Sequence, residues 1–211
     1  MNIGIIVAMD SEYDLMLNAL GGTPDGTIGS HTVHLRRSGM GKVNAAVAAT
    51  VLIRDCHPDC LLSTGVAGAL DPSLKGLDAV VSREIVYHDA WYGEGNAYGQ
   101  IQGFPARFQG DPSLLAVAER LGARPGLFCS GDWFVDTDEV HDRILRDFPD
   151  GIAVDMESAA LAQTCHIHGI PFLSFRLISD TAEDHAGTWE RFWQEVGPAS
   201  FRLIRDFLQN L

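Results

Sequence analysis

The sequence is short of positive charge. Only 15 of its 211 residues are Lys or Arg, against 28 Asp or Glu, which gives a formal net charge of −13. No cluster of basic residues offsets this balance. A polyanion of this kind is repelled by the phosphate backbone of nucleic acids and by acidic lipid surfaces. We therefore expect no nucleic acid and no membrane among its partners.

Long apolar runs are also absent. The longest predominantly apolar segment, 43–53 (VNAAVAATVLI), is about half as long as a membrane span. The first residues, MNIGIIVAMDSEYD, contain no basic segment, so they predict a strand rather than a signal peptide. We expect a cytoplasmic protein.

Cysteines are few, and their spacing is irregular. There are four, at positions 56, 60, 129 and 165, in a chain long enough to bury an ample core without disulfides. Scattered single cysteines without a signal peptide favour reduced thiols. The motif Cys56-His57-x-x-Cys60 has no second ligand pair at a spacing typical of zinc sites. We therefore expect no metal site.

Nucleotide-binding loops are missing as well. The segment SGMGK (38–42) is no P-loop, because Arg36 stands at the place of the distal glycine and Val43 follows Lys42. The segment TGVAG (64–68) lacks the spacing of a dinucleotide fold. We expect no nucleotide cofactor. Each glycine cluster is explained equally well by a close approach to some ligand at a strand end or by a tight structural turn.

Short apolar runs alternate with helical spacings along the whole chain, which predicts one α/β domain over 1–211. The expected architecture is a three-layer sandwich with a mostly parallel, twisted sheet and helices on both faces. A tight turn is expected over 63–70. Strands are expected at 3–8, 31–38, 79–87, 127–129, 152–156 and 171–178. Helices are expected at 11–20, 41–54, 114–121, from Glu157 to a cap at Gly169, and around Gly197-Pro198 near the C-terminus.

Three carboxylates each follow an apolar strand. Glu12 comes after GIIVAM, Glu157 lies in AVDMES, and Asp180 ends FLSFRLISD. Because the carboxyl ends of parallel strands open onto one edge of a sheet, these side chains can converge on one pocket. Each is also explained as an acid that caps the next helix. The residues alone thus indicate an acid-lined pocket in an α/β domain and no more.

Eight segments form an ordered set of motifs along the chain: GIIVAMDSE (4–12), SGMGKVNAA (38–46), STGVAGAL (63–70), YHDA (87–90), YGQIQGFPARF (98–108), SGDWF (130–134), AVDMESAA (153–160) and RLISD (176–180). Together they resemble those of 5′-methylthioadenosine/S-adenosylhomocysteine nucleosidases, members of the purine nucleoside phosphorylase superfamily. The resemblance follows the chain in order from Met1 to the C-terminal helix. The resemblance implies hydrolysis of the bond between adenine and ribose, in methionine salvage and methyl-donor recycling. It also implies a homodimer that needs no metal or cofactor.

The same resemblance implies roles for individual residues. Glu12 matches the carboxylate that activates water, and Asp180 matches the acid that donates a proton toward N7 of adenine. Met156 and Glu157 match the pair that packs on the ribose and holds its hydroxyls.

Further matches concern the walls of the pocket. Phe134 and Val135 match the segment that stacks on the adenine and reads its edge. Met40 and Gly68 match positions at the ribose end. Ser179 and Arg176 match neighbours of the acid at position 180.

The chemistry of this reaction suits these residue types. Breaking the bond to adenine builds positive charge on the ribose and negative charge on the purine, which carboxylates and a carboxylic acid offset respectively. A further carboxylate orients and deprotonates water. Asp180 then has to keep its proton at neutral pH, so we expect neighbouring acids and burial to raise its pKa.

Some residues depart from the family pattern. Val66 stands where the family has a small Ser, Ala69 replaces a Gly, and Asp155 replaces the usual Glu. The segment 91–99 (WYGEGNAYG) has no clear counterpart of the aromatic side chain that a dimer partner lends to the 5′ pocket, although Trp91 or Tyr92 suits that role. These departures concern the 5′ substituent rather than the reaction.

Three alternatives stay open. Phosphorolysis needs a phosphate site at the end of the first strand, where Asp10 and Glu12 would repel the dianion. A futalosine-type substrate with a bulky 5′ group is a second alternative, motivated by the altered segment 91–99. The third is a non-enzymatic adenosine-binding module, although binding alone has no need of a proton donor at N7.

Overall fold

The computed structural model describes residues 1–180 and 202–211, except for the side chain of Asp180. Its central feature within these ranges is a nine-stranded sheet with the order β2-β3-β1-β4-β8-β7-β5-β6, in which β9 pairs with β4 and β5. The strands are β1 (Asn2–Val7), β2 (Asp25–Ile28), β3 (His31–Arg37), β4 (Cys60–Ala69), β5 (Ala79–Tyr87), β6 (Phe108–Gln109), β7 (Arg124–Ser130), β8 (Gly151–Asp155) and β9 (Phe172–Asp180).

Both strand directions occur in this sheet. The parallel pairs are β1–β3, β1–β4, β4–β9, β5–β7 and β7–β8. The antiparallel pairs are β2–β3, β4–β8, β5–β6 and β5–β9. The sheet is therefore mixed and mostly parallel, as the alternation of strands and helices predicts.

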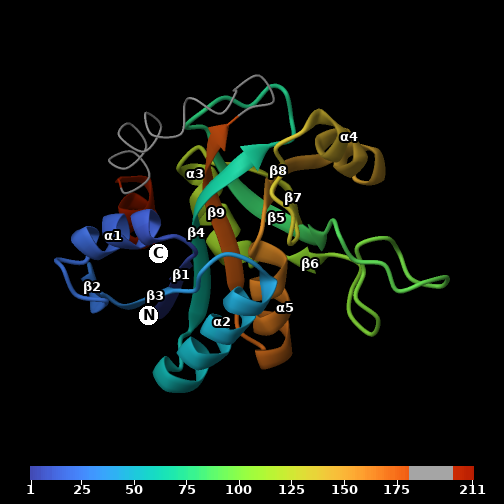
Figure 1. The fold of residues 1–211 in the computed structure, drawn as a ribbon. Coiled ribbons are helices and arrows are strands. Elements are labelled where there is room, and N and C mark those ends of the chain that lie inside the picture. Colours follow the sequence, from blue (N-terminus) through green and yellow to red (C-terminus); the bar gives the residue numbers. More distant parts are fainter. Residues whose placement is uncertain (181–201) are drawn as a thin grey trace.

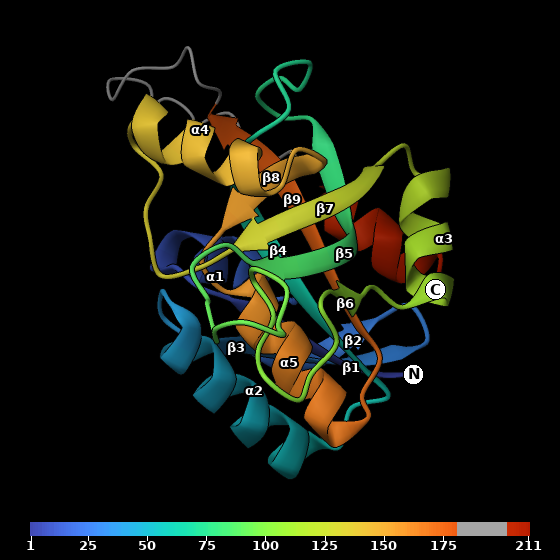
Figure 2. The same cartoon turned by 90° about the vertical axis from the view of Figure 1, so that its right-hand side faces the viewer.

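Helices cover both faces of the sheet (Figures 1 and 2). On one face, α2 and α5 pack in a single apolar cluster with the sheet; on the other, α1, α3 and a helix over 202–209 do the same. The remaining labelled helix, α4, packs with β7 and β8 in a third apolar cluster. The labelled helices are α1 (Asp10–Ala19), α2 (Lys42–Cys56), α3 (Pro112–Arg120), α4 (Asp138–Asp147) and α5 (Ser158–His168).

The side chains of strand β1 pack against helices on both faces of the sheet. Ile3, Ile5 and Val7 belong to the cluster beneath α1, whereas Ile6 belongs to the cluster beneath α2. A side chain at Gly4 would lie only 2.5 Å from Leu52 of α2. Because side chains alternate between the faces of a strand, this continuous apolar run is buried on both sides.

Most expected elements are present with shifted ends, and the strand expected at 79–87 is confirmed with the same bounds. Helix α5 ends at His168, and Gly169 follows in the left-handed conformation, as predicted. Strands β2 and β6 and helix α4 were not predicted from the sequence. The C-terminal helix is described over 202–209, while Gly197-Pro198 and the rest of 181–201 lie outside the described residues.

The prediction of a tight turn over 63–70 is wrong. Strand β4 continues through this segment to Ala69 and pairs with β9 from Leu61 to Gly68. The ladder to β9 shifts register between Ala67 and Gly68, so the glycine-rich composition is accommodated as an irregularity within a strand rather than as a turn.

All four cysteines are free, and three of them are buried. None of the helices in the described part of the chain combines the length and apolar character needed to cross a membrane.

Candidate active site

A cavity of about 150 Å³ lies where several strands end, and it collects residues from distant parts of the sequence. Eight of the residues singled out in the sequence line it together: Glu12, Met40, Gly68, Phe134, Val135, Met156, Glu157 and Ser179. The remaining lining residues are Ala8, Met9, Val66, Ala67, Trp133, Val154 and Asp155. The cavity is thus lined largely by apolar groups, and each charged residue among those that line it is an acid.

Glu12 is held at the start of α1 by backbone groups from the connection between β1 and α1 and from β4. Its Oε2 accepts hydrogen bonds from the N–H groups of Ala8 (2.9 Å) and Met9 (3.0 Å), and its Oε1 accepts one from Val66 in β4 (3.1 Å). Burial raises the pKa of Glu12, although these three donors and the nearby charge of Arg176 act in the opposite direction. This carboxylate is both part of the helix start and a wall of the cavity.

Gly65 makes room for that carboxylate. It adopts a φ of +134°, and a Cβ at this position would lie 2.1 Å from Oε1 of Glu12. An L side chain is therefore excluded here both by the backbone conformation and by space.

Glu157 lies two residues after the end of β8, far from Glu12 in the sequence, and it lines the same cavity. Its Oε1 accepts a hydrogen bond from the N–H of Gly41 at 2.8 Å. Burial, and then the negative charge of Asp155, raise the pKa of Glu157 to about 7. Glu157 occupies the N-cap position of α5, but its side chain makes no capping hydrogen bond. The capping interpretation therefore does not account for this side chain.

Arg176 lies behind the cavity rather than in its lining. Its guanidinium donates to the carbonyl oxygen of Thr64 (2.6 Å), to Oγ of Ser63 (2.8 Å) and to Oδ2 of Asp155 from both Nη2 (3.0 Å) and Nε (3.2 Å). Asp155 also accepts hydrogen bonds from Ser158. This buried ion pair ties β4, β8 and β9 together beneath the site.

The side chain of Asp180 lies outside the described residues, so its predicted place in the pocket stays a prediction. Its backbone is described as the end of β9, where it is the register partner of Gly68, a residue that lines the cavity. Ser179, the preceding residue, also lines the cavity.

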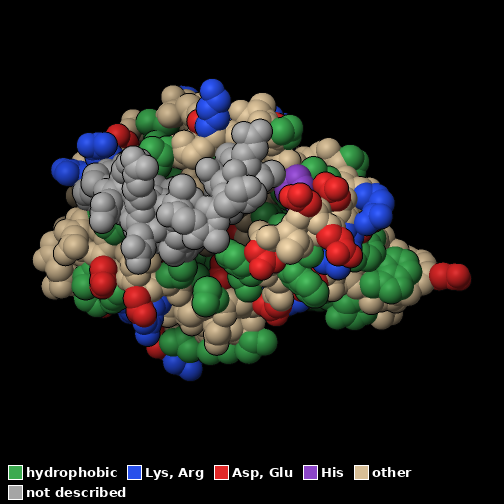
Figure 3. Space-filling model, turned by 45° about the horizontal axis from the view of Figure 1, so that its top comes forward, with side chains coloured by type: hydrophobic (Ala, Val, Ile, Leu, Met, Phe, Trp, Pro, Cys, Tyr) green, Lys and Arg blue, Asp and Glu red, His purple; other side chains and the backbone are tan. Residues whose placement is uncertain are grey.

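Trp133 also lines the cavity, a role that was not predicted from the sequence. Trp133 is 48% exposed, and its ring packs beneath the guanidinium of Arg143, whose Cζ lies 5.1 Å from the ring centroid. Its position beside Phe134 in the SGDWF motif was the available signal. Figure 3 views the end of the molecule where β4 and β9 finish, and it shows hydrophobic and acidic side chains interspersed there.

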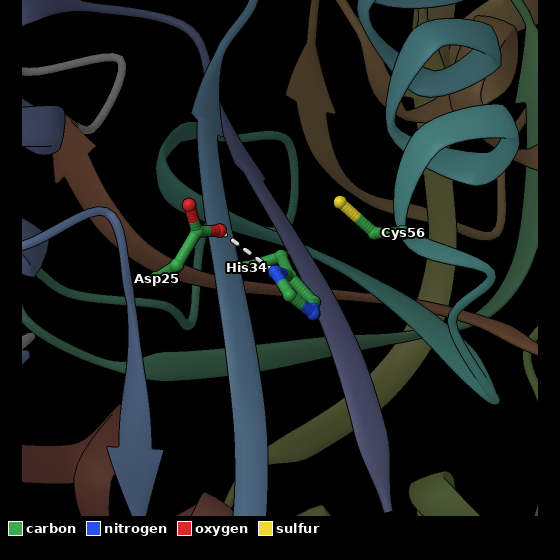
Figure 4. Close-up of side chains that lie close together, drawn as sticks. All are labelled: Asp25, His34 and Cys56. Atoms are coloured by element: carbon green, nitrogen blue, oxygen red, sulfur yellow. Dashed lines mark hydrogen bonds and ion pairs between the residues drawn. The ribbon is translucent and has the colours of Figure 1, made fainter.

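A cluster away from the cavity offers the groups of a metal site. Ligand atoms of Asp25, His34 and Cys56 lie within 4.8 Å of one another (Figure 4), on β2, β3 and the end of α2. Arg36 already donates to Oδ1 of Asp25 (3.0 Å) and to Sγ of Cys56 (3.5 Å). A protein cation therefore neutralises this carboxylate, and we assign the cluster as an ion-paired surface group. Cys60 takes no part, because it packs in the cluster on the other face of the sheet.

Comparison with known proteins connects this geometry to one superfamily. The sequence model of one protein family, the phosphorylase superfamily, matches residues 2–209 of this chain. The 5′-methylthioadenosine/S-adenosylhomocysteine nucleosidase from Neisseria meningitidis, solved with methylthio-immucillin-A, is 33% identical over 100% of this chain and 99% of that chain, with a TM-score of 0.93. The S-adenosylhomocysteine nucleosidase from Streptococcus pyogenes, solved with 5-methylthiotubericidin, is 34% identical over 100% and 97%, also with a TM-score of 0.93.

A relative with a different activity is also similar. The futalosine hydrolase of Helicobacter pylori is 26% identical over 100% of this chain and 98% of that chain, with a TM-score of 0.90. The family match covers nearly the whole chain, and the solved relatives share its fold from end to end. The chain belongs to the phosphorylase superfamily of enzymes.

Proposed function

We propose that this enzyme hydrolyses the N-glycosidic bond of 5′-methylthioadenosine and S-adenosylhomocysteine, giving adenine and the corresponding 5-thioribose product. The observation that carries the proposal is the pair of buried carboxylates, Glu12 and Glu157, in one largely apolar cavity. The relatives from Neisseria meningitidis and Streptococcus pyogenes, solved with nucleoside analogues, support the choice of substrate.

Glu12 is proposed as the general base. A buried carboxylate with a raised pKa is suited to take a proton from water near neutral pH. The water oxygen then forms a bond to C1′ of the ribose while the bond from C1′ to N9 of adenine breaks. The electron pair of that bond stays with the purine, and the proton donated by Asp180 goes to N7. Adenine and the free sugar leave.

The remaining predicted residues are proposed to bind the substrate. Phe134 and Val135 would hold the adenine, with Trp133 at the same rim. Met156 and Glu157 would hold the ribose, where the carboxylate also offsets the positive charge that develops on the sugar. Met40 and Gly68 would line the ribose end, and Ser179 would lie next to the acid. Arg176 is proposed to act from behind, through Asp155 and β4.

Phosphorolysis is the less favoured reaction for electrostatic reasons. The charged groups among the described lining residues are Glu12, Asp155 and Glu157, and the guanidinium of Arg176 is engaged by protein oxygens. A charge of the same sign about 4 Å away costs about 4 kcal/mol at an effective dielectric near 20. A phosphate dianion would therefore bind poorly beside these carboxylates.

A futalosine-type nucleoside is the second candidate substrate. The similarity to the Helicobacter pylori futalosine hydrolase supports it, as does the unusual segment 91–99. Trp91 and Tyr92 are exposed, and Trp91 packs against Tyr98 at a centroid distance of 6.0 Å. Aromatic rings with free faces are suited to cover a bulky 5′ group.

A homodimer is also part of the proposal. Val43, Val47 and Val51 are 74%, 58% and 38% exposed and recur every four residues on one face of α2. Such an apolar stripe is typical of a surface that another protein covers. Analytical ultracentrifugation tests this: a chain that stays monomeric at assay concentrations contradicts the dimer.

The free thiols support a reducing, cytoplasmic location.

The reaction is tested by measuring adenine release from methylthioadenosine, adenosylhomocysteine and aminodeoxyfutalosine, each with and without phosphate. We expect release from the first two substrates, independent of phosphate, with free sugar as the second product. Release that requires phosphate and yields a sugar 1-phosphate would establish phosphorolysis instead. Faster turnover of aminodeoxyfutalosine would establish the second substrate class, and no release by folded protein would favour a binding module.

A further inference from the structure

The orientation of Glu157 depends on one backbone group from a distant segment. The N–H of Gly41, which lies 116 residues away in sequence, donates to Oε1 of Glu157 at 2.8 Å. Gly41 is the N-cap of α2 and has a φ of +92°. Because helix starts expose unpaired N–H groups, the position of this donor depends on whatever holds the first turn of α2 in place.

Three charged side chains hold that turn, and we call Lys42, Asp89 and Asp132 the α2 clamp. Oδ1 of Asp132 accepts a hydrogen bond from the N–H of Lys42 at 2.8 Å. Nζ of Lys42 donates to Oδ2 of Asp89 at 2.6 Å and lies 3.7 Å from Oδ2 of Asp132. The same Oδ2 of Asp89 accepts the N–H of Asp132 at 2.8 Å.

The α2 clamp joins three elements next to the cavity. Lys42 begins α2, Asp89 follows β5, and Asp132 follows β7. Lys42 is also fixed by Tyr87, whose ring centroid lies 5.6 Å from Nζ. A Cβ at Gly41 would lie 2.9 Å from Oδ1 of Asp132, so the carboxylate and the Gly41 backbone are in close contact. The position of Gly41 is thus set by the clamp rather than by α2 alone.

We propose that the α2 clamp is a positioning device that holds the N–H of Gly41 against Glu157 and so keeps this carboxylate aimed at the ribose. The inference rests on the proposed function for its kinetic consequences. None of the three side chains is among the residues that line the cavity, so each acts through Gly41 and Glu157.

The consequence for the pH profile follows from the groups around Glu157. Asp155 in β8 and Glu12 in α1 disfavour its charged form, while Arg176 in β9 and the N–H of Gly41 favour it. Weakening the Gly41 hydrogen bond raises the pKa of Glu157. Binding of the ribose needs the charged form of Glu157. The acid limb of the pH profile of kcat/KM therefore moves to higher pH when this pKa rises.

The test compares Asp132→Ala with Asp111→Ala. Asp111 caps the start of α3 by accepting hydrogen bonds from Ser113 (3.0 Å) and Leu114 (3.1 Å), so its removal is a matched loss of a helix-capping carboxylate outside the cavity lining. Melting temperatures are to be measured to check that both variants fold. Asp132→Asn, which keeps an oxygen that accepts the Lys42 N–H, is the conservative variant.

For Asp132→Ala we expect kcat/KM for methylthioadenosine to fall about tenfold or more, and its acid limb to rise by about one pH unit, the range for a hydrogen bond to a charged group. Asp132→Asn should restore at least half of the loss on a logarithmic scale. Asp111→Ala should change stability without moving the acid limb. An Asp132→Ala profile that matches that of Asp111→Ala overturns the proposal, as does a lower kcat/KM with an unmoved limb.

A second readout does not depend on turnover. The amide resonance of Gly41, followed in ¹⁵N-labelled protein, should shift as Glu157 titrates, and its midpoint should rise in Asp132→Ala. An unchanged midpoint overturns the proposal even if activity falls. A wild-type chain that releases no adenine contradicts the proposed function, and the Gly41 titration then decides the positioning role by itself.

Discussion

Replacing Gly65 by Ala is the sharpest test of the role of Glu12. The new Cβ would lie 2.1 Å from Oε1 and 2.6 Å from Cδ of Glu12, and 2.9 Å from Nη1 of Arg176. Ordinary contacts begin at about 3.4 Å, so the carboxylate has to move by roughly 1 Å or more. The backbone φ of +134° adds strain, because L side chains rarely adopt it.

The magnitude follows from what this movement breaks. The hydrogen bond from Val66 to Oε1 of Glu12 is 3.1 Å long and is lost first. A hydrogen bond to a charged group contributes about 1.5–3 kcal/mol, and a shift of about 1 Å in a catalytic group costs about 100-fold in rate. We therefore expect kcat/KM to fall about 100-fold and the free energy of unfolding to fall by about 2–4 kcal/mol, with the backbone strain included.

The assay is adenine release from methylthioadenosine, measured beside urea unfolding. Gly76→Ala is the matched control, because a Cβ at Gly76 meets nothing within 4 Å and its φ is unexceptional. That variant should keep wild-type kcat/KM. A Gly65→Ala enzyme within threefold of wild type would refute the reasoning, since Glu12 would then tolerate displacement.

Three further predictions concern the same site. Asp180→Asn should reduce turnover about 100-fold or more by removing the proposed proton donor at N7, and near-normal adenine release would remove that role. Arg176→Met should destabilise the protein by about 3–5 kcal/mol, because it leaves Asp155 buried without its partner; urea unfolding measures this, and a loss below about 1 kcal/mol contradicts the buried ion pair. Glu157, whose pKa burial raises to about 7, binds its proton more tightly in the folded than in the unfolded chain. Its contribution to stability is therefore complete below the unfolded pKa, near 4.5, and is lost as pH rises toward 7. Glu157→Gln should flatten this part of the stability curve, and an unchanged curve would contradict the raised pKa.

Local patterns predicted most of the strands and helices, because burial on both faces imposes a recognisable apolar run. The strand at 79–87 is the clearest case, and α5 with its Gly169 cap is another. Helix α4 gave a weak pattern, because only Val140 and Ile144 are buried in its ten residues. The prediction of a turn over 63–70 was wrong because the pairing of β4 with β9 overrides the turn preference of a glycine-rich segment.

Sequence order alone indicated which carboxylates belong together, and Glu12 and Glu157 do line one cavity. The rule behind this expectation, that parallel strands end at one edge of a sheet, holds for β1, β4 and β9 but not for β8, which runs antiparallel to β4. Glu157 reaches the same cavity because β8 pairs with Gly68 and Ala69 at the end of β4. Residue 180 is placed by its backbone beside Gly68, and the direction of its side chain stays a prediction.

The chemical character of those carboxylates was decided by tertiary structure. The hydrogen bond from Gly41 to Glu157 joins segments 116 residues apart, and Arg176 in β9 donates to Asp155 in β8. No local pattern encodes such contacts, since they depend on how strands from distant segments come into register. A sequence can specify an acid at a strand end, but burial and the donors brought to it by the fold determine whether that acid holds or releases its proton.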